Sequence, residues 1–140
     1  MVTDPFLIPS IENLGDLPVL DQETLDQLIE IDCGELGLTI EMVELFTTDQ
    51  PKRFVALKSA IESNDLTKIM EISHAIKGSA GTIGAMRLRA LAAMLEAYGR
   101  GYEVEVPPSQ LYEQLLSAYS CVSHALDAHI KRSTSTTIEE

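Results

Sequence analysis

The chain has 140 residues, which is enough for one domain with a single hydrophobic core. Its 22 acidic residues against 10 basic ones give a formal net charge of −12, which argues against binding nucleic acid through phosphates. There is no run of about 18 apolar residues and no basic, apolar leader, so we expect no membrane segment and a cytoplasmic location. Cys33 and Cys121 lie far apart and fit reduced thiols. We therefore expect protein partners.

The first part of the chain predicts an extended arm and then two helices. Residues 1–19 contain three prolines among scattered apolar residues, so we expect an extended N-terminal arm. Asp21 is placed to cap a short helix from Thr24 to Ile31 that ends near Gly34. One apolar helical face then continues from 36 to 62 through Pro51, which predicts a single helix kinked at the proline, although a new helix could begin at Asp49-Gln50-Pro51. That face consists of Leu36, Ile40, Val43, Phe46, Phe54, Leu57 and Ile61.

Three further helices are predicted in the second part. Asn64-Asp65 caps a helix from 66 to 80, and Gly81 and Gly84 form the turn after it. The next helix stops at Gly99-Arg100-Gly101, and Pro107-Pro108 begins the last one. The apolar stripes of these two helices are Leu88, Leu91, Ala92, Leu95 and Tyr98, and Leu111, Leu115, Ala118, Val122 and Leu126. The fold class is all-α: an antiparallel four-helix bundle over 20–131 with a short extra N-terminal helix, followed by a disordered tail at 132–140.

His74 lies on the polar side of the helix predicted from 66 to 80. At about 100° of rotation per residue, the middle of the apolar stripe lies roughly 140° from His74, and Gly78 lies opposite the stripe. Lys77 flanks the histidine. The stripe consists of Leu66, Ile69, Ile72, Ser73, Ile76 and Ala80. We therefore predict that the His74 imidazole is exposed to solvent, and that Gly78 leaves the helix surface beside it without a side chain.

This arrangement suits phosphoryl transfer. Exposed imidazoles titrate near neutral pH, so an unprotonated ring nitrogen is available as a nucleophile. A phosphoryl group on His74 would carry roughly two negative charges, which Lys77 can partly offset. Gly78 leaves room for a partner's active site to approach, and Ser79 can hydrogen-bond backbone or phosphoryl oxygens. A solvated histidine beside an ordinary helix end is the structural alternative, and the neighbouring Lys, Gly and Ser argue against it.

At these residues the chain resembles histidine-containing phosphotransfer (HPt) domains of two-component phosphorelays. The family signature is a phospho-accepting His followed by Lys-Gly-Ser and a small-residue stretch that reaches Gly-Ala. His74, Lys77-Gly78-Ser79 and Gly84-Ala85 match it, whereas Ala80 replaces a common second serine. Leu45-Phe46 leading to Asp49, and Leu95 through Arg100, resemble flanking helices of the family. The resemblance covers residues from about 20 to about 130.

The resemblance implies a phosphorelay intermediate. His74 would be the phosphoacceptor, taking a phosphoryl group from one receiver-domain aspartate and passing it to another, and Lys77 would stabilise the phosphoryl charge. Gly78, Ser79, Glu71 and Ala75 would form the partner-docking surface, with Asp49 and Arg100 as weaker candidates near the histidine. The expected partners are response-regulator receiver domains and a hybrid sensor histidine kinase. The chain would be a monomer without a cofactor of its own, and the receiver would bring Mg²⁺.

Other functions fit the sequence less well. A non-catalytic adaptor or phosphate sink could bind a receiver or kinase through the same surface, but it would not need the nucleophile. A histidine kinase needs a His-Glu motif followed by a Pro, and an ATP-binding domain, and the sequence shows neither. An enzyme with its own substrate needs a second catalytic group, and the sequence shows no candidate for one. His124 and His129 are five residues apart, so they cannot share a metal across one helical turn, and we expect both to be solvated. We expect no metal site.

Overall fold

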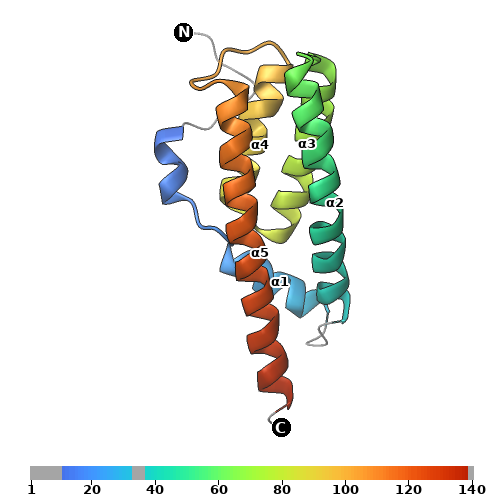
Figure 1. The fold of residues 1–140 in the computed structure, drawn as a ribbon. Coiled ribbons are helices and arrows are strands. Elements are labelled where there is room, and N and C mark those ends of the chain that lie inside the picture. Colours follow the sequence, from blue (N-terminus) through green and yellow to red (C-terminus); the bar gives the residue numbers. More distant parts are fainter. Residues whose placement is uncertain (1–10, 33–36, 139–140) are drawn as a thin grey trace.

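The computed structural model describes residues 11–32 and 37–138, and within these ranges it is helical. A 3₁₀ helix, η1 (Ile11–Asp16), precedes five α-helices: α1 (Gln22–Ile31), α2 (Gly37–Glu62), α3 (Leu66–Ile83), α4 (Met86–Gly99) and α5 (Pro108–Ile138). The helices α2 to α5 run alternately up and down, and α1 lies at one end of them (Figure 1). Each of the four packs against two neighbours, in the cyclic order α2, α3, α4, α5. The all-α bundle with a short extra helix is confirmed.

The predicted apolar stripes form the core between these helices. Fully buried side chains come from all four long helices and from Leu25 of α1: Leu57, Ile69, Ile76, Leu88, Leu95, Leu111, Leu115, Val122 and Leu126. Leu66 lies at the edge of the core and is 39% exposed. Leu36 and the expected helix end near Gly34 lie outside the described residues. None of the described helices is long and apolar enough to cross a membrane.

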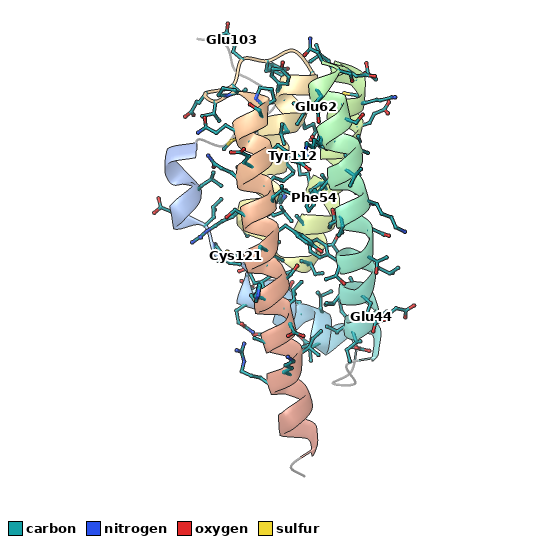
Figure 2. The ribbon with its side chains drawn as sticks, viewed as in Figure 1. Glu44, Phe54, Glu62, Glu103, Tyr112 and Cys121 are labelled. Carbon is teal, nitrogen blue, oxygen red and sulfur yellow. The ribbon has the colours of Figure 1, made fainter. Side chains whose placement is uncertain are left out.

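Helix α2 is continuous through Pro51, so the alternative second start at Asp49 does not occur. Proline has no N–H to donate to the carbonyl four residues earlier, which belongs to Thr47. The Tyr119 hydroxyl of α5 donates to that carbonyl at 3.2 Å, and its ring packs against Phe46 and Phe54. Further along the same α2–α5 seam, the Tyr112 hydroxyl donates to the carbonyl of Phe54 at 3.0 Å (Figure 2). Contacts from α5 thus stabilise α2 around its proline.

Helix α3 begins where the sequence predicts but extends further. The Asp65 side chain accepts from the backbone N–H of Lys68 at 3.2 Å and caps the helix. The helix continues to Ile83 and ends at Gly84, whose φ of 86° is the left-handed conformation that glycine adopts at helix ends. Gly81 is therefore inside α3 and not in a turn, which corrects the prediction for this residue. Burial of Ala80 and Ile83 keeps the last turn packed against the core.

The two ends of the described chain differ from the predicted arm and tail. Residues 11–16 form η1 where an extended arm was expected, and Arg87 of α4 holds η1 and the turn after it by donating to the carbonyls of Gly15 and Leu17. Asp21 caps α1 as predicted, by accepting from the N–H of Thr24. Helix α5 runs through 132 to Ile138, where a disordered tail was expected, because each residue added to an existing helix gains one hydrogen bond at no nucleation cost.

Candidate functional site

His74 lies on the outer face of α3, and its side chain is 65% exposed. Ile76 and Ser73, on the inner side of the same helix, are fully buried. The imidazole is therefore held at the surface by the burial of the residues around it, as the periodicity of the sequence predicts. Its Nδ1 lies 3.0 Å from Oε2 of Glu96, which projects from the neighbouring helix α4.

Glu96 is the centre of an ion-pair cluster between α3 and α4. Its side chain is fully buried. Lys77 Nζ lies 2.6 Å from Oε1, and the Arg100 guanidinium donates to Oε2 at 2.9 Å. Lys77 comes from the turn of α3 after His74, whereas Arg100 directly follows α4. Two cations and the imidazole thus share one carboxylate.

The surroundings of Glu96 favour its ionised form. Burial on its own raises the pKa of this carboxyl group, but hydrogen bonds from Lys77, Arg100 and His74 lower it, and the net pKa lies below the usual value. Glu96 is therefore a carboxylate at neutral pH and can only accept hydrogen bonds. Its contact with the imidazole requires the proton on Nδ1, which leaves the lone pair of a neutral ring on Nε2. The arrangement selects the nucleophilic nitrogen.

Sequence reasoning missed Glu96, although a signal was present. Helix α4 is buried on nearly all sides, with Ala90, Leu91, Ala92, Met94, Leu95 and Ala97 in the interior. A helix that is apolar all round is an interior helix. A single carboxylate within such a helix must be paired with cations or hydrogen-bond donors, because an isolated buried charge is very costly. The apolar character of residues 90–98 therefore marks Glu96 as a residue with partners.

The surface next to His74 has the composition expected of a docking face. Glu71, one turn before the histidine, is exposed, and Ala75 is half-buried. A Cβ placed on Gly78 would have no heavy atom within 4 Å, so this part of α3 is open to an approaching partner. The geometry agrees with the predicted surface at these residues, and their role in docking stays a prediction.

Two further candidate residues lie between α2 and α3. Ser79 accepts a hydrogen bond from the Arg53 guanidinium at 2.9 Å, so its hydroxyl is engaged with α2 and does not face the imidazole. Asp49 lines a cavity of about 180 Å³ between α2 and α3, together with Ser79 and Thr82. No described contact joins Asp49 to His74. Arg100, by contrast, is joined to His74 through Glu96.

The two histidines of α5 differ from each other. His124 is exposed, and its Nδ1 lies 2.9 Å from the carbonyl of Ser120. His129 is only 8% exposed, which corrects the expectation that it is solvated. It follows Val122 and Leu126 at helical spacing on the buried side of α5.

Comparisons with known proteins give a matching family and a similar solved structure. The model of the Hpt domain family matches residues 41–132, a range that includes the cluster around Glu96. The solved structure of histidine-containing phosphotransfer protein B from Pseudomonas aeruginosa PAO1 is similar, with a TM-score of 0.71 and 25% sequence identity. The match covers 82% of this chain and 96% of that one.

Three curated proteins are similar in sequence. Multistep phosphorelay regulator 1 of Schizosaccharomyces pombe is 25% identical over 111 residues. Phosphorelay intermediate protein YPD1 of Candida albicans is 22% identical over 89 residues. Phosphorelay intermediate protein rdeA of Dictyostelium discoideum is 30% identical over 80 residues. The matches cover 76%, 64% and 57% of this chain. They cover 38%, 48% and 32% of those proteins, so the chain spans less than half the length of each relative.

Proposed function

The chain belongs to the Hpt domain family, and on that premise we propose that it is a phosphorelay intermediate. In this proposal His74 accepts a phosphoryl group from the aspartyl phosphate of one receiver domain and passes it to the aspartate of another. The observation that carries the proposal is the hydrogen bond between His74 Nδ1 and the buried Glu96 carboxylate, because it presents Nε2 as an exposed nucleophile.

In this proposal the transfer step uses this geometry. The Nε2 lone pair attacks phosphorus, an N–P bond forms, and the O–P bond to the receiver aspartate breaks, so that aspartate leaves as a carboxylate. The ring keeps its proton on Nδ1 and becomes positively charged on phosphorylation. Glu96, 3.0 Å from Nδ1, stabilises that charge. The second transfer reverses these bonds on another receiver, and Nε2 returns to its neutral form.

Lys77 and Arg100 supply positive charge next to the acceptor. Both pair with Glu96 in the resting protein. On phosphorylation the phosphoryl oxygens become a second anionic partner within reach of the Lys77 ammonium group, one turn from His74. We infer that Lys77 helps to offset the transferred charge and that Mg²⁺ is brought by the receiver.

The partners belong to the same proposal. We infer that response-regulator receiver domains exchange the phosphoryl group with His74, and that a hybrid sensor kinase can supply it. The chain would act as a carrier that does not use ATP. Its monomeric state, its cytoplasmic location and the lack of a cofactor of its own stay predictions from the sequence.

The proposal is tested by phosphoryl transfer from a receiver domain. An isolated receiver is phosphorylated with radiolabelled acetyl phosphate, freed of the small molecule and mixed with the chain in Mg²⁺ buffer. We expect label on the chain that is lost in acid and retained in alkali, as expected for phosphohistidine. His74→Gln should accept no label and change the free energy of unfolding by no more than about 0.5 kcal/mol, because the side chain is exposed.

The exposed His124 provides the control, since His124→Gln removes a histidine on a different helix and should leave labelling unchanged. Label on His74→Gln at the wild-type rate would exclude His74 as the acceptor. Binding of the receiver without any label on the wild-type chain would instead indicate a non-catalytic adaptor.

A further inference from the structure

Arg89 of α4 occupies the space where a side chain at Gly81 would lie. A Cβ built on Gly81 would be 3.3 Å from Nε and 3.4 Å from Cδ of Arg89. The arginine therefore crosses from α4 over the backbone of α3 at a position where α3 has no side chain. This contact gives Gly81 a packing role inside the helix, in place of the predicted turn.

Gly81 lies on the same face of α3 as His74. It follows the histidine by seven residues, which is a rotation of about 20° short of two full turns and a distance of about 10 Å along the helix. The side chain of Arg89 thus reaches the phosphoacceptor face on the C-terminal side of His74. Glu71 lies on the N-terminal side of the same face, so the exposed charges of Glu71 and Arg89, on either side of the histidine, have opposite signs.

Arg89 differs from the other two cations of this region. Lys77 and Arg100 pair with Glu96, whereas Arg89 is exposed and forms no ion pair or hydrogen bond within residues 11–32 and 37–138. The chain as a whole has a net charge of −12, so the exposed arginine places a positive charge on an otherwise acidic protein. Its guanidinium is available to a partner.

We propose that Arg89 is a receiver-docking residue that pairs with carboxylates around the receiver's phosphorylation site. The inference rests on the proposed function and names a further contact of the same surface. A site that binds Mg²⁺ is built from carboxylates, so the face that a receiver presents to His74 is acidic. Arginine suits such a contact because its planar guanidinium pairs with carboxylates through two hydrogen bonds.

Distance separates this role from that of Lys77. Gly81, over which Arg89 lies, is about 10 Å from His74 along the helix, more than the screening length of about 8 Å at physiological ionic strength, so Arg89 should add little to stabilising the phosphoryl group itself. It lies well within a typical interface of about 800 Å² per partner. Arg89 should therefore affect how readily the receiver binds, and leave the rate within the bound complex unchanged.

The test measures transfer from a receiver labelled with acetyl phosphate as a function of receiver concentration, at low and high salt. For Arg89→Gln we expect a half-saturating concentration about three- to fivefold higher at low salt, with a saturated rate within about twofold of wild type. Arg89→Glu should raise that concentration further, to about tenfold or more. Both differences should shrink at high salt.

Lys58→Gln is the matched control, because Lys58 is an exposed cation on the α2–α5 side of the bundle and its loss changes the net charge equally. It should behave as wild type. Equal half-saturation for wild type, Arg89→Gln and Lys58→Gln would overturn the docking role while leaving the relay function in place. A lower saturated rate at unchanged half-saturation would also overturn it. Failure of the wild-type chain to take up any label would overturn the proposed function and this inference with it.

Discussion

The Glu96 carboxylate links the three residues for which we propose roles at the site of transfer. It fixes the ring proton of His74 on Nδ1 and pairs with Lys77 and Arg100. Its own burial is tolerated because these donors surround it, in accordance with the high cost of an unpaired buried charge. The reactivity of the exposed imidazole is thus set by a residue that solvent does not reach.

Glu96→Gln is expected to slow phosphoryl transfer by about tenfold at saturating receiver. A neutral amide no longer stabilises the positively charged ring, and its N–H₂ group can orient toward Nδ1 and favour the other tautomer. Transfer rates together with nitrogen NMR of the imidazole measure both effects. Glu113→Gln, which changes an exposed carboxylate on α5, is the control. An unchanged tautomer and an unchanged rate would contradict the positioning role.

Lys77→Ala is expected to slow transfer by severalfold without preventing it. The Lys77 ammonium group pairs with the buried Glu96 carboxylate, and the interface with a receiver excludes water and strengthens the field of the ammonium group. The saturated rate should fall and the half-saturating receiver concentration should stay constant, the opposite of the expectation for Arg89. If the saturated transfer rate of Lys77→Ala equals that of wild type at low and at high salt, the lysine only neutralises Glu96.

At the scale of elements, glycines show how closely α3 and α4 approach each other. A Cβ on Gly99 would lie 2.6 Å from the backbone N of Met70 and 2.8 Å from the carbonyl oxygen of Leu66. These are backbone atoms of α3, which cannot move aside as a flexible side chain can. The close approach of the two helices, which brings Glu96 to His74, therefore depends on the missing side chain of Gly99.

Gly99→Ala is expected to destabilise the fold by about 1–3 kcal/mol, because α3 and α4 must move apart. Gly78→Ala is the matched variant: it lies in open space and should be neutral or stabilising by up to about 1 kcal/mol, since alanine favours the helix. Urea unfolding of the two variants measures the contrast. Equal stability of both would mean that the backbones of α3 and α4 are not in the close contact described.

At the scale of the whole molecule, the ion-pair cluster makes stability depend on pH. The pKa of Glu96 is lower in the folded chain than in the unfolded one, so its ionisation stabilises the fold above the unfolded pKa of about 4.3. That contribution is lost as the pH falls through the lower, folded pKa. Acid should therefore weaken the contact between α3 and α4.

The free energy of unfolding of the wild-type chain is expected to fall more steeply below about pH 4.5 than that of Glu96→Gln, which has no carboxyl group to protonate at this position. Urea titrations across the acid range provide the measurement. Glu71→Gln should follow the wild-type curve. Parallel curves for wild type and Glu96→Gln would show that the cluster does not contribute to acid sensitivity.

The sequence by itself determined the helices, their buried faces and the exposure of His74. Each of these follows from a local period: apolar residues three or four positions apart must face the interior, and a residue outside that stripe must face solvent. The same local reasoning placed Lys77 and Gly78 beside the histidine. It also found the cap at Asp65, because a cap depends on neighbouring residues alone, but it ended the helix at residue 80 instead of Ile83.

Only the tertiary structure decided which residues of α4 meet α3. Glu96 reaches His74 from 22 positions away, Arg89 lies over Gly81, and Ser79 pairs with Arg53 of α2. The register between two packed helices is set by the close contact at Gly99 and by the interlocking of many side chains. The periodicity of a single helix does not specify that register, so the partners of His74 can be identified only from the packed helices.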